Sequence, residues 1–317
     1  MTNDTYTTQV LDHLGIVAGI CQQIGLIEQI DEQVADTGRK VSVGQAVQAL
    51  VLNGLGFVNR PLYLMPEFYA NKPVEALVGD GISAADLNDD CLGRALEHLA
   101  EAGVTEVFAK VSAHALQVFG IETRFAHLDT TAFSLHGEYD PEKTTVGDEE
   151  PVPIQVTYGY SKDHRPDLKQ AVLGLICPGI PLRYANQHSI PVWLTALDGN
   201  RADKSSFPDI AKAYLAQFEA EAATPYLVAD SALYGATTLQ NLSKIKWVTR
   251  VPATLSQAQK LLATVDQSQM TAANQDGYFY YEQGVTYADI EQRWLLVLYE
   301  PNRERELVTD HPAGETA

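Results

Sequence analysis

The sequence has few cysteines and no long apolar run, and each shortage excludes a class of protein. Its three cysteines, Cys21, Cys91 and Cys177, form no CxxC pair, so neither a zinc ribbon nor a disulfide framework is supported, and buried free thiols are expected. No apolar stretch approaches the ~20 residues that a bilayer-spanning helix needs. The N-terminus also lacks the basic start and apolar core of a signal peptide. We therefore expect a cytoplasmic protein with no membrane partner.

Basic residues are also scarce. The 317 residues contain 22 Lys and Arg against 41 Asp and Glu, a formal net charge of −19. Such a charge repels nucleic acid, so any DNA binding must use local basic patches. Residues 125–255 are the least acidic part, with 11 basic and 15 acidic side chains. Candidate phosphate contacts there are Lys162, Arg165 and Lys169, near Tyr158 and Tyr160, then Arg201 and Lys204, and more weakly Lys244, Lys246 and Arg250. For each cluster a solvated face is the alternative.

What is present is an ordinary globular composition, 45% hydrophobic and 20% charged, in a chain long enough for two domains. Between about residues 9 and 120, apolar residues recur at spacings of three and four, as in Val10, Leu14 and Val17, which predicts helices. Ser42 and Asp86 stand where helix N-caps are expected. We predict an all-α domain over 1–122, which could read DNA ends, dimerise or brace the fold.

The period changes to that of strands after Arg124. Strands are predicted at 125–135, 153–160 and 170–176, with a weaker one at 182–186. A helix at 204–223, a strand at 226–229, a helix at 236–243 and a strand at 246–250 follow. This order predicts a mixed α/β core over 123–252, with helices on the faces of a mixed sheet. Beyond it we predict a helix at 255–265, a β-rich segment over 253–300 and a disordered tail over 301–317.

Two aspartates interrupt these apolar strand runs, although Asp is normally depleted from strands. They are Asp129 in Phe125–Phe133 and Asp230 directly after Tyr226–Ala229. Inside such runs we expect buried carboxylates, which are costly without a partner. If the two strands are neighbours, the carboxylates meet and suit Mg²⁺ or Mn²⁺, whose pairs catalyse in-line phosphoryl displacement. A further acidic ligand is then needed. The alternatives are a local hydrogen bond at Asp129 and a helix cap at Asp230. His127 shares the face of Asp129, where packing or a local hydrogen bond competes with a ligand role.

Four motifs in order carry a resemblance to a known family: residues 127–131 (HLDTT), 158–170 (YGYSKDHRPDLKQ), 199–204 (GNRADK) and 228–234 (VADSALY). Together they resemble the DDE transposases of bacterial insertion sequences. The closest branch has an N-terminal helical domain, a ribonuclease H-like core and a β-rich insertion. The resemblance implies that Asp129 and Asp230 are catalytic metal ligands, that DNA ends and target DNA are bound, and that the active complex is a homo-oligomer.

The third acid of that family, a glutamate on a helix after the insertion, has no clear counterpart here. Glu300, Glu304 and Glu306 lie in a stretch without helical period, and none is assigned. The expected function is metal-dependent cleavage and strand transfer at insertion-sequence ends, with the catalytic helix missing from this chain. The alternative is a non-catalytic remnant or regulator that binds DNA or a partner transposase. A third hypothesis, a hydrolase of small phosphoesters, requires His127 as a ligand.

Overall fold

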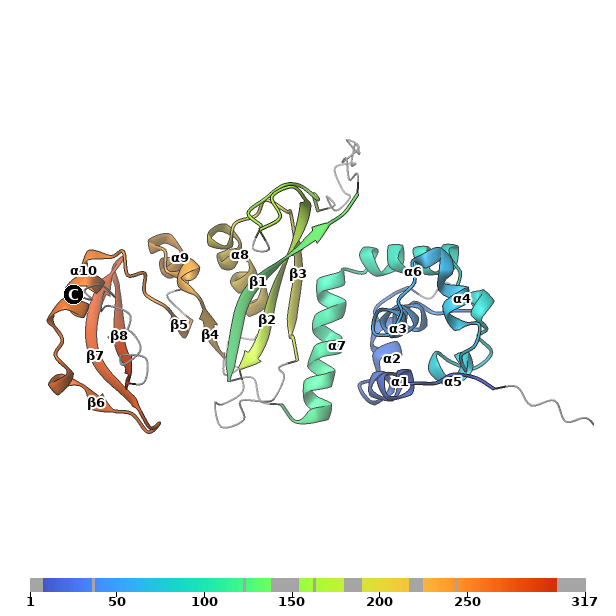
Figure 1. Cartoon of the computed structure of the whole chain (residues 1–317), viewed down its shortest axis with the longest axis horizontal. Coiled ribbons are helices and arrows are strands. Elements are labelled where there is room, and N and C mark those ends of the chain that lie inside the picture. The colour runs from blue at the N-terminus through green and yellow to red at the C-terminus, as the bar shows by residue number, and fades with distance from the viewer. Residues whose placement is uncertain are drawn as a thin grey trace, which may run out of the picture. The chain divides into compact units, whose positions relative to one another are not determined.

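The computed structural model (Figure 1) describes residues 8–35, 38–121, 124–137, 154–161, 164–179, 190–216, 225–242 and 245–300. The chain divides into two compact units, Met1–Arg201 and Ala202–Ala317. Each unit is described by itself. The domain boundaries expected at residues 122, 252 and 300 stay predictions, and the tail expected over 301–317 lies outside the described residues.

The first unit begins with helices, as the apolar periodicity predicts. They are α1 (Leu14–Gln23), α2 (Leu26–Asp31), α3 (Val43–Gly54), η1 (Leu62–Leu64), α4 (Met65–Tyr69), α5 (Val74–Leu77), η2 (Ala84–Asp86), α6 (Asp89–Glu101) and α7 (Val104–Phe119). Ser42 is the N-cap of α3, because its hydroxyl accepts a hydrogen bond from the Gln45 amide while the Gln45 side chain bonds back to the Ser42 amide. Asp86 instead ends η2, and Asn88 caps α6.

One apolar core joins these helices. Its fully buried members include Leu14, Leu52, Met65, Tyr69, Leu77, Leu87 and Leu92. The Tyr69 hydroxyl donates a hydrogen bond to the Ala49 carbonyl at 2.8 Å, so its one polar atom is satisfied inside the core. Helix α3 approaches α2 closely, since a Cβ on Gly44 would lie 2.5 Å from the Ile27 carbonyl oxygen. Packing of these apolar faces stabilises helices that are too short to form alone.

Three antiparallel strands complete the first unit: β1 (Phe125–Leu135), β2 (Lys169–Gly179) and β3 (Trp193–Leu197), in the order β3-β2-β1. Helix α7 packs against β3 (Figure 1). The strands predicted at 125–135 and 170–176 are confirmed as β1 and β2. The strand predicted at 182–186 lies outside the described residues, and β3 was missed.

The strand predicted at 153–160 is wrong, since its described part makes an isolated bridge from Thr157 to Gln170. The segment instead lies against the Asp198–Gly199 turn, where Gln155 bonds to both residues of the turn. A Cβ on Gly159 would lie 2.0 Å from the Gly199 carbonyl oxygen, a contact that a side chain at that position would prevent.

The second unit alternates helices and strands before ending in an antiparallel sheet. It contains α8 (Asp203–Leu215), β4 (Tyr226–Ala229), η4 (Ser231–Leu233), α9 (Ala236–Asn241), β5 (Trp247–Thr249), α10 (Ser256–Thr264), η5 (Gln267–Gln269), β6 (Thr271–Ala272), β7 (Tyr278–Tyr287) and β8 (Ile290–Tyr299). Strands β4 and β5 are parallel, and the last sheet runs β6-β7-β8. The elements predicted from residue 204 to 299 are thus confirmed in type and order where the structure describes them, and residues 217–223 of the helix predicted at 204–223 lie outside that part.

The predicted fold class is confirmed: the chain is mixed α/β, with helices first and then strands interleaved with helices. Along the chain, three antiparallel strands precede α8, β4, α9 and β5, which is the order that the resemblance implies for a ribonuclease H-like core. Within the described ranges, no helix is both long enough and apolar enough to cross a bilayer.

Candidate metal centre

Asp129 lies on the exposed face of β1. Burial alternates along the strand, so Ala126, Leu128 and Thr130 point to the core and His127 and Asp129 point away from it. One carboxylate oxygen of Asp129, Oδ1, accepts a hydrogen bond from the Thr130 amide at 2.8 Å. The expectation of a buried carboxylate is therefore wrong at this position, because the alternating pleat of β1 turns Asp129 toward solvent.

Asp230 follows the last residue of β4 and is also exposed. It is the N-cap of η4, because its Oδ1 accepts a hydrogen bond from the Ala232 amide at 2.8 Å. Its own carbonyl accepts hydrogen bonds from the Leu233 amide and, at 2.5 Å, from the Thr249 hydroxyl at the end of β5. Two neighbouring parallel strands thus fix the backbone of this aspartate.

Both local alternatives expected from the sequence occur, yet neither uses the whole carboxylate. The Oδ2 atoms of Asp129 and Asp230 receive no hydrogen bond from the described residues, and neither aspartate forms an ion pair with them. An exposed carboxylate with a free oxygen suits a hard cation such as Mg²⁺. Asp129 belongs to the first unit and Asp230 to the second.

A third acidic ligand is not found in the part of the chain that the structure describes. No group of three His, Cys, Asp or Glu side chains there could hold a metal ion. Glu300 is exposed, and its amide bonds to the Gly277 carbonyl, while Glu304 and Glu306 lie outside the described residues. The third ligand thus stays unassigned.

His127 stands two residues before Asp129 on the same exposed face of β1. Desolvation by its surroundings lowers the pKa of its imidazole, which favours the neutral form that ligates metals. Its side chain makes no hydrogen bond with the described residues. Of the two alternatives to a ligand role, packing or a local hydrogen bond, the hydrogen bond is therefore not formed with the described residues.

The structure describes only some of the basic residues expected to contact DNA, and one of these is already in an ion pair. Arg165 forms a bidentate ion pair with Asp167, at 2.9 and 2.7 Å, and each partner shifts the pKa of the other away from neutrality, that of Asp167 to about 2. Lys169 begins β2, and Arg201 is exposed at the end of the first unit. Lys162 and the Lys204 side chain lie outside the described part. Their contacts with DNA stay predictions.

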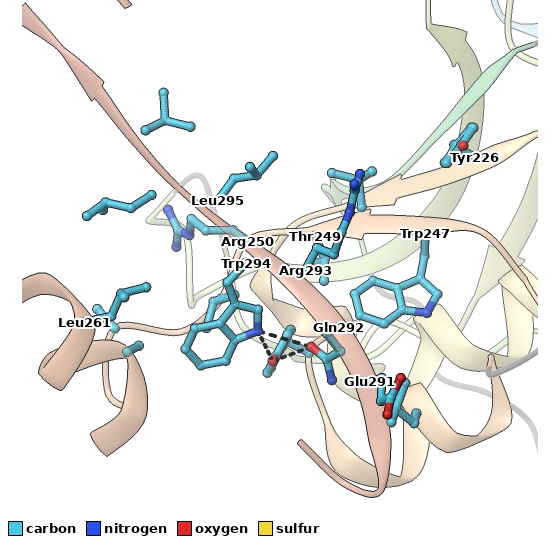
Figure 2. Close-up of a pocket in the computed structure, with 18 of the residues that line it drawn as sticks. Tyr226, Trp247, Thr249, Arg250, Leu261, Glu291, Gln292, Arg293, Trp294 and Leu295 are labelled. Atoms are coloured by element: carbon cyan, nitrogen blue, oxygen red, sulfur yellow. Dashed lines mark hydrogen bonds between the residues drawn. The ribbon is translucent and has the colours of Figure 1, made fainter. Parts of the chain in front are cut away.

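A buried polar network connects the residues after Asp230 to β8, and sequence reasoning missed it. The Tyr234 hydroxyl donates to Gln292 Oε1 at 2.7 Å, and the Trp294 indole nitrogen donates to the Tyr234 oxygen at 3.1 Å (Figure 2). All three side chains are less than a tenth exposed. Gln292 shares one face of β8 with Ile290 and Trp294, and a polar residue between apolar ones at a spacing of two is the signal that could have revealed it.

An open groove of about 830 Å³ lies beside this network in the second unit (Figure 2). Its lining comes from the end of β4, from β5, from α10 and from β8. Thr249 and Arg250 belong to this lining and also contact the Asp230–Ser231 turn, through the Thr249 bond and through Arg250 Nη2, 3.5 Å from Ser231 Oγ. Thr249 and Arg250 therefore connect the groove directly to the turn that carries Asp230.

Comparisons with known proteins give a match to one family model and a similarity to solved structures. Residues 6–113 match a family described as a domain of unknown function, DUF4277. Among solved structures, the chain is similar to the "Mos1 transposase paired-end complex with left transposon end", at 8% sequence identity and a TM-score of 0.23. That match covers 70% of this chain and 62% of the other, so the chain spans less than two thirds of that protein. No curated protein matches the sequence.

Proposed function

We propose that the chain is a DDE-type transposase homologue in which Asp129 and Asp230 bind Mg²⁺ or Mn²⁺ for DNA cleavage and strand transfer at insertion-sequence ends. The observation that carries the proposal is that both aspartates are exposed, each with one unbonded carboxylate oxygen, on β1 and directly after β4. The order of the core elements along the chain and the four sequence motifs support the same proposal.

The chemistry of these two residues fits the metal. Their Oδ1 atoms are held by backbone amides, which orients each carboxylate and leaves Oδ2 for a cation. Asp129 and Asp230 would hold the ions, whose chemistry when bound would be to activate a water or 3′-hydroxyl nucleophile and to stabilise the leaving oxygen. Thr249 holds the Asp230 carbonyl, so β5 contributes to the orientation of that ligand. A third acidic ligand would come from beyond the described residues or from another chain.

A second candidate function is a non-catalytic regulator that binds DNA ends or an intact transposase. It is favoured by the lack of a third acid among the described residues and by the net charge of −19. A titration on terminal inverted-repeat DNA separates the two functions. Nicking that requires Mn²⁺ supports the transposase, whereas binding without nicking supports the regulator.

Metal binding tests the site directly. Mn²⁺ should bind weakly to the full chain, and Asp129→Asn or Asp230→Asn should each abolish that binding, because two carboxylates supply most of the ligand charge. The measurement is the electron paramagnetic resonance signal of free Mn²⁺ during a titration.

Asp289→Asn is the matched control, since Asp289 is exposed in the β7–β8 turn at a φ of 61°, where asparagine is equally tolerated. Unchanged affinity in both Asp129→Asn and Asp230→Asn would disprove the assignment.

A further inference from the structure

The groove of the second unit exposes more apolar surface than a solvated strand face requires. Four of its lining residues are large apolar side chains that are at least half exposed: Val248 (50%), Leu262 (54%), Leu295 (57%) and Val297 (57%). They come from three separate elements, β5, α10 and β8, and meet in one hollow. Apolar residues gathered in a concave surface indicate a ligand site.

The charge of the groove is opposite to that of the unit around it. Residues 202–317 contain nine Lys and Arg against fifteen Asp and Glu. The groove lining nevertheless has three cations, Lys246, Arg250 and Arg293, against one anion, Glu291. Arg293 also pairs with Glu282 at 3.3 Å, whereas Lys246 and Arg250 form no ion pair with the described residues. The groove therefore favours a ligand that is anionic and apolar at once.

Aromatic side chains complete the lining. The Lys246 ammonium lies 5.4 Å from the centre of the Tyr226 ring, and the neighbouring Trp247 is half-buried at the groove. Along β5 and the residues that flank it, Lys246, Val248 and Arg250 are exposed at every second position, so an apolar side chain stands between two cations. Cations for phosphates, combined with flat apolar and aromatic surface for bases, are how proteins bind single-stranded nucleic acid.

We propose that this groove binds single-stranded DNA, with phosphates at Lys246 and Arg250 and bases against Val248, Leu295 and Trp247. The proposal deepens the function proposed above and rests on it, since Arg250 contacts Ser231, the residue after the Asp230 ligand. The groove thereby holds the strand that passes beside Asp230. Lys246 and Arg250 belong to the weakest of the three basic clusters expected from the sequence, and the groove adds an apolar surface for bases beside them.

The experiment measures binding of a fluorescent oligodeoxythymidine of about 12 nucleotides, within the usual site size of such grooves. The full chain is used in EDTA, so that binding does not depend on the metal ligands. The double variant Lys246→Gln/Arg250→Gln should bind at least tenfold more weakly. Its plot of log affinity against log salt should be shallower by about 1.4, because each phosphate contact on a single strand contributes about 0.7.

A matched control is Lys212→Gln/Lys260→Gln, which removes two exposed lysines of the same unit that do not line the groove. Base contact is tested by tryptophan emission. Trp247 is the half-exposed tryptophan of the groove, whereas Trp193 and Trp294 are buried, although Trp294 also borders the groove. DNA should quench the emission, and Trp247→Phe should remove the quenching.

Three results would overturn the proposal: no binding of the oligonucleotide, equal losses in the groove and control variants, or equal binding of base-free polyphosphate. Failure of the Mn²⁺ experiment with intact DNA binding in EDTA would instead overturn the metal site and leave the groove. The two hypotheses therefore fail separately.

Discussion

The hydroxyl of Tyr69 shows how a single buried polar atom contributes to stability. It donates to the Ala49 carbonyl inside the helical core, and burial raises the pKa of the phenol far above its usual value. Tyr69→Phe should therefore lower the free energy of unfolding by about 1 kcal/mol, the usual net value of one hydrogen bond. Urea denaturation measures this. Tyr63→Phe, at a tyrosine that is 68% exposed, should leave the free energy of unfolding unchanged. Equal losses in Tyr69→Phe and Tyr63→Phe would contradict the role of the hydrogen bond.

Asp86 should make the free energy of unfolding depend on pH in the acidic range. Hydrogen bonds from Lys40 and then Ser83 lower its pKa from 3.8 to about 2. Because the pKa of Asp86 is lower in the folded than in the unfolded protein, its ionised carboxylate stabilises the fold. This contribution is complete above about pH 4 and is lost as the pH falls toward about 2. The measurement is urea denaturation of wild type and Asp86→Asn across this range. The difference in free energy of unfolding between wild type and Asp86→Asn should become smaller as the pH falls. A difference that does not change with pH would argue against the ion pair.

Close packing between elements should make two similar glycines respond in opposite ways. Gly44→Ala should destabilise by several kcal/mol, because the new Cβ would meet the backbone of Ile27 at 2.5 to 3.0 Å, where no flexible side chain can yield. Gly93→Ala, inside α6 with no atom within 4 Å, should stabilise by about 0.5–1 kcal/mol. Thermal unfolding of both variants checks the pair, and a loss in both would show that helix α6 is less tolerant than its surroundings indicate.

The type of most elements was readable from the sequence, because their apolar periods are local properties. The helices α3 and α10 and the strands β1, β4 and β7 are examples. The segment at 153–160 has an equally strand-like composition, but it lies against the Asp198–Gly199 turn through contacts with residues about forty positions away. A prediction from a short stretch of sequence cannot take account of a contact with residues so far along the chain.

At the scale of the whole molecule, the metal role of the two candidate residues stays a prediction, and their surroundings differ from those expected. Sequence motifs singled out Asp129 and Asp230, and the structure gives each a free carboxylate oxygen. The expected burial was wrong, because apolar neighbours on a strand do not reveal which face the carboxylate takes. The groove was also missed, since Val248, Leu262 and Leu295 come together only through the tertiary fold.

The hydrogen-bond network of Tyr234, Gln292 and Trp294 also determines how the second unit should unfold. It joins the segment after β4 to the terminal sheet by buried hydrogen bonds, and breaking them would leave polar groups unpaired in an apolar cluster that includes Leu239 and Ala258. The terminal sheet and the Asp230 turn should therefore unfold in one cooperative step. Amide hydrogens of β8 and of the Asp230 turn would then share a single opening free energy, which links the proposed metal ligand to the global stability of its unit.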